Sequence, residues 1–185
     1  MSTPTNRTEL TGKYTLDPAH TRIGFVARHA MVTKVRGSFN EFEGTATLDG
    51  EDPSRSSAEL TIQAASIDTR NDDRDGHLRS NDFLAMEDYP EITFRTTGIA
   101  PTGEDNFDVT GDLTIKGVTQ SVTVPFSFEG QATDPFGNVR VGFDGALVIN
   151  RKDFGITWNA ALETGGVLVS DKVTLELEVS AIKTG

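Results

Sequence analysis

The sequence predicts an all-β protein, an extended antiparallel β-barrel of about eight strands with a short helical insert. Apolar and polar residues alternate with a period of two along most of the chain, and several of these runs are long. Turn-forming pairs such as Asp49-Gly50 and Lys116-Gly117 separate the runs. A strand with one apolar and one polar face is typical of antiparallel sheets. Long strands of this kind close into a barrel or pair as a sandwich, and we predict the barrel.

The first part of the chain divides into a leader and the start of the sheet. Residues 1–12 are polar and lack a pattern, so we predict a flexible leader followed by a single domain at 13–185. The segment 33–48 has the composition of a strand, but the phase of its alternation slips. A bulge near Asn40 would reconcile the two halves.

The second half of the chain carries the longest alternating runs. They cover residues 107–115, 122–132, 139–149 and 173–181. Pro125 lies on the polar face of the second run. A proline cannot donate to a strand ladder, so we predict an edge, a bulge or an end of pairing at this position.

Residues 66–90 break the alternation and carry helix signals. Asn71 or Asp72 can cap a short helix that runs to about Ser80, and a second short helical piece ends before Pro90. We predict that these two pieces lie between strands and cover one end of the barrel.

Composition excludes several classes of protein. The chain has no cysteine, which rules out disulfides and thiolate metal sites. The formal net charge of -11 disfavours nucleic acid and anionic membrane surfaces as partners. No stretch has the roughly 20 apolar residues of a membrane span, so we expect no stable membrane insertion. The first residues lack the apolar core of a secretion signal, so we expect a cytoplasmic protein.

The apolar face of the strands is the strongest candidate for a binding site. It mixes large side chains with glycine and alanine, whereas a fully filled small barrel needs bulky side chains throughout. The glycines leave room for a guest, or they only let the strands bend, and both interpretations stay open. Trp158 could plug one end or line the tunnel. The predicted tunnel lining is Phe25, Phe94, Phe107, Val109, Leu113, Val124, Phe126, Phe128, Val141, Phe143, Leu147, Trp158, Leu175 and Leu177.

Three polar residues are candidates for contact with a ligand's head group. His29 shares the parity of Phe25, so it should point inward near a strand end, where it meets a head group or a buried carbonyl. Arg74 and His77 lie in the helical insert and could bind an anionic head group, although a solvated helix is the simpler interpretation. The histidine spacing matches no metal-ligand pattern, so we expect no metal and no cofactor. No nucleophile is paired with a base, so we expect no catalytic residues and no enzyme.

Several motifs, in the right order, resemble the YceI-like polyisoprenoid-binding family. The resemblance runs from Tyr14 to Ile182 and implies a lipocalin-like extended barrel with a tunnel for a long isoprenoid or similar amphiphile. It also implies dimerisation, so a homodimer is an expected state. The motifs are 14–25 (YTLDPAHTRIGF), 70–84 (RNDDRDGHLRSNDFL) with 89–94 (YPEITF), 111–119 (GDLTIKGVT) and 150–156 (NRKDFGI).

These observations lead to one functional hypothesis and two alternatives. The hypothesis is non-catalytic binding, transport or storage of a long amphiphilic lipid in the barrel, whether a polyisoprenoid, an isoprenoid quinone or a fatty-acid-like molecule. The first alternative is a small enzyme that acts on a bound amphiphile, with His29 as the inward base. The second is a ligand-free structural or interaction module with a filled barrel.

Overall fold

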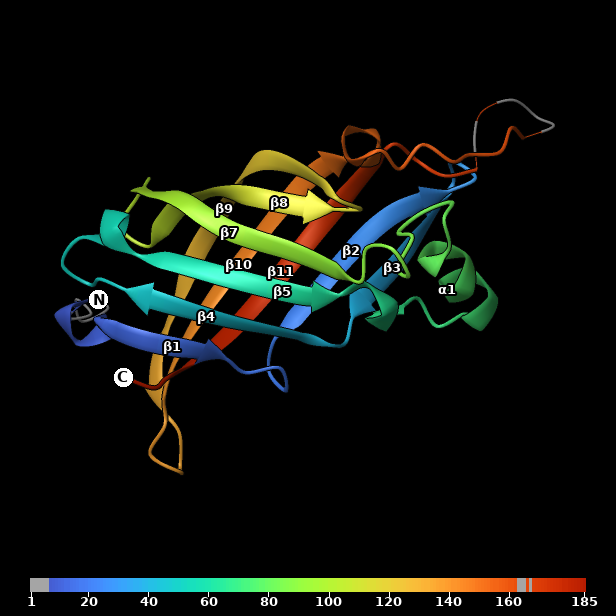
Figure 1. The fold of residues 1–185 in the computed structure, drawn as a ribbon. Coiled ribbons are helices and arrows are strands. Elements are labelled where there is room, and N and C mark those ends of the chain that lie inside the picture. Colours follow the sequence, from blue (N-terminus) through green and yellow to red (C-terminus); the bar gives the residue numbers. More distant parts are fainter. Residues whose placement is uncertain (1–6, 163–165, 167) are drawn as a thin grey trace.

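The protein is a closed antiparallel barrel in which one continuous sheet forms the wall (Figure 1). The computed structural model describes residues 7–162, 166 and 168–185. Closure comes from β1, which pairs with β4 on one side and with β11 on the other. The eight barrel strands in spatial order are β1 (Gly12–Leu16), β4 (Phe42–Leu48), β5 (Ser57–Gln63), β7 (Glu91–Pro101), β8 (Asn106–Ile115), β9 (Val118–Thr133), β10 (Val139–Asn150) and β11 (Lys172–Lys183). The predicted eight-stranded all-β barrel is therefore confirmed.

Three further strands extend the wall beside β11. They are β2 (Arg22–His29), β3 (Thr33–Phe39) and β6 (Ile67–Asp68). β11 is long enough to pair with β1 through its last residues and with β2 through its first half. The β2–β3 hairpin consequently projects from the end of the barrel that lies away from both labelled termini (Figure 1).

The phase slip near Asn40 is a break between two strands, so the predicted bulge is wrong. Asn40 and Glu41 separate β3 from β4. β3 pairs with β2, whereas β4 pairs with β1 and β5. The backbone N–H of Asn40 donates to the carbonyl of Ser66 at 3.2 Å. The alternation restarts because the chain changes partners here, and sequence parity alone does not distinguish that change from a bulge.

Pro125 lies where pairing lapses, as its missing N–H predicts. Within β9 it is opposite Asp108 of β8. The ladder between β9 and β10 ends one residue away, at Phe126 opposite Gly145. The first half of β9 and the second half of β10 therefore diverge.

The helical insert closes one end of the barrel. α1 (Asp72–Arg79) begins at Asn71, whose side chain accepts from the N–H of Arg74 at 3.0 Å. The second predicted helical piece is a series of turns that buries Phe83 and Leu84. Short 3-10 segments complete the described fold: η1 (Arg7–Leu10), η2 (Pro53–Arg55), η3 (Ala64–Ser66) and η4 (Arg151–Phe154). Among the described residues, no helix is long and apolar enough to cross a membrane.

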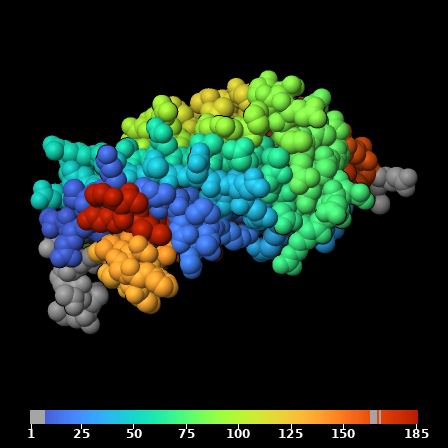
Figure 2. All heavy atoms as spheres, turned by 60° about the horizontal axis from the view of Figure 1, so that its bottom comes forward, coloured from blue at the N-terminus to red at the C-terminus, as the bar shows by residue number. Residues whose placement is uncertain are grey.

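The predicted leader, 1–12, has only its second half within the described residues. Arg7–Leu10 forms η1, and the side chain of Leu10 is buried. The Tyr14 hydroxyl donates to the carbonyl of Leu10 at 2.9 Å. This part therefore packs against the barrel end instead of forming a loose leader. In Figure 2 the first described residues and the C-terminus lie at one end of the molecule, and the green helical insert lies at the other.

Candidate functional site

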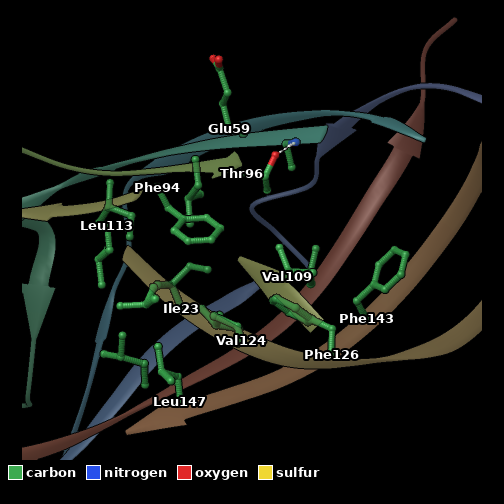
Figure 3. A pocket seen from close by; sticks show the side chains of 18 of the residues that line it. Ile23, Glu59, Phe94, Thr96, Val109, Leu113, Val124, Phe126, Phe143 and Leu147 are labelled. Atoms are coloured by element: carbon green, nitrogen blue, oxygen red, sulfur yellow. Dashed lines mark hydrogen bonds between the residues drawn. The ribbon is translucent and has the colours of Figure 1, made fainter. Parts of the chain in front are cut away.

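An elongated apolar cavity of about 390 Å³ runs through the barrel (Figure 3). Two buried clusters lie towards its two ends. Phe83, Phe154 and Ile156 belong to the cluster at the α1 end, and Tyr14 and Phe128 belong to the one near the chain termini. Between them, many inward side chains are only half-buried because they face open space instead of one another. A closely packed interior would have buried these side chains fully.

All but one of the predicted lining residues border this cavity. The exception is Trp158, whose ring centroid lies 4.6 Å from that of His77 and 5.3 Å from that of Phe83. Trp158 thus packs at the α1 end and acts as a plug. Further lining residues share the same strand parity but were not singled out in the sequence. They include Ile23, Leu60, Ile62, Ile92, Ile115, Val122, Ile149, Val173 and Val179.

The inner-face glycines hold phenylalanine rings against the wall. A Cβ atom on Gly145 would lie 2.7 Å from two ring atoms of Phe126, its partner across the strand pair. A Cβ atom on Gly111 would lie 2.6 Å from Phe94 Cζ. These glycines therefore do not simply add empty space or bend the strands. They let the rings lie flat on the backbone, and the centre of the barrel stays open as a result.

His29 does not point into the cavity, which corrects the expectation from its parity. It is the last residue of β2, it is exposed, and it forms an isolated bridge with Val169. The alternation fails here because the chain turns immediately afterwards, at Ala30. Among the described residues that border the cavity there is no histidine.

The two candidate head-group residues of the insert lie outside the cavity lining. The guanidinium of Arg74 donates to the hydroxyl of Thr69 and to its carbonyl, both at 2.7 Å. The same Thr69 hydroxyl donates to the buried carboxylate of Asp75. His77 Nε2 lies 2.9 Å from the Asp82 carboxylate. Arg74 and His77 therefore already have partners within the insert, and a contact of either residue with a head group stays a prediction.

The polar part of the lining gathers at the other end, beside the β4–β5 connection. Pairing between β5 and β7 ends at Glu59 opposite Arg95. Beyond that point the Thr96 hydroxyl accepts from the N–H of Ala58 at 2.9 Å, and Glu59 points away from the cavity (Figure 3). We call this region the mouth, and its polar lining residues are Thr45, Asp49, Ser56, Ser57, Glu59 and Thr96. The lining here includes Asp49, Gly50 and Ser56, which belong to the connection between the strands and are only half-buried, whereas most of the α1-end lining is buried. We infer that the cavity opens to solvent at this end.

One cation, Arg151, borders the cavity at its closed end. Its side chain is 4% exposed. Its NH1 group donates to the carbonyls of Ile156 and Trp158 at 2.8 and 2.9 Å, and its Nε donates to the carbonyl of Ser170 at 2.9 Å. Burial lowers the pKa of Arg151, and the nearby carboxylate of Asp171 partly opposes this effect. With its donors occupied by backbone, Arg151 ties Ile156 and Trp158 on one side and Ser170 on the other to the barrel.

The described residues contain no cluster of histidine, aspartate and glutamate arranged to hold a metal ion. The cavity therefore offers apolar contact along almost all of its lining, a few polar residues such as Ser56 and Thr96 at the mouth, and an arginine with backbone partners at its base.

Comparison with known proteins identifies the family to which this barrel belongs. The model of the YceI-like domain matches residues 14–181. The chain belongs to the YceI-like family. A UPF0312 protein of Staphylococcus epidermidis is 42% identical over 165 residues, which cover 89% of this chain and 94% of that protein. A UPF0312 protein of Azotobacter vinelandii is 38% identical over 137 residues, 74% of this chain and 71% of that protein.

Solved YceI-like structures share the fold. BcnA of Burkholderia cenocepacia superposes with a TM-score of 0.79 at 28% identity, covering 89% of this chain and 98% of that one. A domain of Saccharophagus degradans described as polyisoprenoid-binding gives a TM-score of 0.70 at 17% identity, covering 92% and 98%. At that identity the likeness supports the fold alone.

Proposed function

We propose that this YceI-like protein binds one long apolar amphiphile inside the barrel and acts as a non-catalytic carrier or reservoir. The observation that carries the proposal is the continuous apolar cavity, which is closed by buried side chains at the α1 end. Burial of an isoprenoid or fatty chain there contributes about 25 cal/mol per Å² of apolar surface, before ordering costs. The Saccharophagus degradans domain, which is described as binding polyisoprenoid, agrees with this class of ligand.

The ligand's polar head belongs at the mouth in this proposal. Polar lining residues are concentrated there, and the lining in the middle of the barrel is apolar. A head group at the mouth keeps its hydration, whereas one at the α1 end would face an arginine whose donors are already used. The tail then extends from the mouth towards Phe154.

The enzymatic alternative required His29 to act as a base inside the cavity, and the geometry does not support this role. Its only inward base candidate is exposed and lies outside the cavity lining. The filled-barrel alternative disagrees with the half-buried side chains in the barrel centre. The carrier is therefore the function that this geometry supports best.

Lipid extraction tests the proposal directly. Protein purified without detergent should release a stoichiometric amphiphile on organic extraction, detected by mass spectrometry. A variant with a blocked lumen, Val109→Trp, should release much less, and the outward substitution Thr110→Trp on the same strand is the matched control. If neither protein carries a lipid, and delipidated wild type binds neither added polyprenol nor added quinone, the proposal is wrong.

A further inference from the structure

The outer face of β2, β3, β10 and β11 carries a shallow groove bordered by basic side chains. Arg28, Lys34, Arg36 and Lys172 line it, and all four are exposed. Their concentration contrasts with the formal net charge of -11. We call this feature the basic groove.

Most of the positive charge in the basic groove is not neutralised. Within the described part of the chain, Arg28, Lys34 and Lys172 have no ion-pair partner. The two carboxylates of the groove are already engaged. Glu176 lies 3.7 Å from both Arg22 and Arg36, and Asp171 lies 3.4 Å from Lys152.

The floor of the basic groove is apolar. Val26 on β2 is paired with Arg36 on β3 and with Thr174 on β11. Val148 on β10 is paired with the same Thr174 and is 55% exposed. These residues point away from the cavity because they alternate with the inward side chains of the same strands. Half-buried Val26 and exposed Val148 lie among the cations and give the groove an amphipathic character.

The β2–β3 turn adds an apolar tip next to the groove. Met31 is 60% exposed and Val32 is 76% exposed. Ala30 and Met31 adopt φ values of 51° and 66°, a left-handed conformation that glycine or asparagine usually occupies. The N–H of Ala30 donates to the carbonyl of Leu168 at 2.8 Å, which braces the tip from behind. The tip thus carries backbone strain, and although the Met31 sulfur lies close to Gly166, Met31 and Val32 both stay largely exposed.

We propose that the basic groove and the Met31–Val32 tip form a docking surface for an anionic lipid bilayer. Exposed apolar side chains next to lysine and arginine are the arrangement of proteins that lie on membranes, where the cations meet lipid phosphates and the apolar tip enters the interface. At physiological salt the Debye length is about 8 Å, so the local patch governs contact while the net charge of the whole chain is screened. An acidic protein would also match the cations, but it would need its own pocket for a protruding tip. This inference rests on the proposed function, because a lipid carrier has to meet the membrane that supplies its cargo.

Vesicle sedimentation tests the docking surface. Wild type should bind vesicles of phosphatidylcholine with about one third phosphatidylglycerol, bind pure phosphatidylcholine vesicles weakly, and lose affinity as salt rises. Each basic residue near the surface contributes about a fivefold gain in affinity. The triple variant R28A/K34A/K172A should therefore bind anionic vesicles about a hundredfold more weakly. M31S/V32S should weaken binding while keeping the salt dependence.

The matched control is R55A/R95A/K116A, which removes the same charge from other parts of the surface. It should bind anionic vesicles as wild type does. Equal loss in both triple variants, or equal binding to neutral and anionic vesicles, would overturn the docking surface. Tighter binding to soluble polyglutamate than to vesicles would overturn it in favour of an acidic protein. Lipid extraction from the same variants keeps the two proposals apart, since a failed docking surface leaves the bound amphiphile in place.

Discussion

Replacing Gly145 with alanine should weaken ligand binding about as much as it weakens the fold. The new Cβ atom would lie 2.7 Å from two ring atoms of Phe126. Ordinary contact begins at 3.4 Å, so the ring has to move away by at least about 0.7 Å. The ring of Phe126 lies between the backbone of Gly145 and the open cavity, so a new Cβ atom pushes the ring into the cavity. Overpacking in a filled core typically costs about 1–3 kcal/mol, and an open lumen should hold the cost near the lower end.

The displaced ring then occupies space that the ligand uses. Loss of contact with one or two carbon groups costs about 0.8 kcal/mol each, so affinity should fall about fourfold to fifteenfold. Titration of delipidated protein with a polyprenol, followed by native mass spectrometry, measures this change, and urea unfolding measures the stability. The control is Gly98→Ala, whose Cβ would have no atom within 4 Å. The double variant G145A/F126L should recover the affinity. Unchanged affinity in Gly145→Ala, or failure of the double variant to recover it, would refute the idea that glycines keep the rings out of the lumen.

Three further predictions concern the parts of the structure that support the cavity. Arg151→Met should lower the free energy of unfolding by about 3–5 kcal/mol in urea, because several backbone carbonyls at the closed end lose their only charged donor; a loss below 1 kcal/mol would contradict this role. Asp75→Ala should cost about 2 kcal/mol by leaving two buried donors at the base of α1 without an acceptor, again measured in urea, while Asp72→Ala on the exposed side of the helix serves as its comparison. Burial alone would raise the pKa of the Asp134 carboxyl, but hydrogen bonds from backbone N–H groups and from Arg140 outweigh it and lower the pKa from 3.8 to about 2. The contribution of Asp134 to stability is therefore present above pH 4 and lost as pH falls towards 2, and thermal unfolding across this range should show a smaller acid loss in Arg140→Gln than in wild type.

The barrel could be predicted from the sequence because alternation is a local signal. In each strand the apolar residues at every second position mark the face that points inward. Nearly all of the cavity lining can therefore be predicted from this alternation. Partner choice is not local. Nothing near Asn40 shows that β3 and β4 pair with different neighbours, and nothing in the first strand shows that it closes the barrel against β11.

The polar features were harder to predict for the same reason. The alternation along the strand predicted that His29 points inward. His29 is the last residue of β2, however, and the alternation does not continue where the strand ends. The mouth depends on where the β5–β7 ladder stops, which is a relation between two strands. The basic groove likewise depends on strand neighbours, since Arg28 and Lys172 are distant in sequence and meet only through the β2–β11 pairing. The net charge of the whole chain does not reveal such a local cluster of basic side chains.

Photocrosslinking tests most directly whether the cavity holds the ligand. A polyprenol with a diazirine near the end of its chain would be bound to delipidated protein, activated by light, and mapped by peptide mass spectrometry. A ligand inside the barrel should give one label per chain, on inward residues such as Phe126, Leu147 and Leu175, with little label on outward neighbours such as Ala146 and Thr174. Label spread over the outer face, or confined to the Met31–Val32 tip, would contradict a ligand inside the barrel.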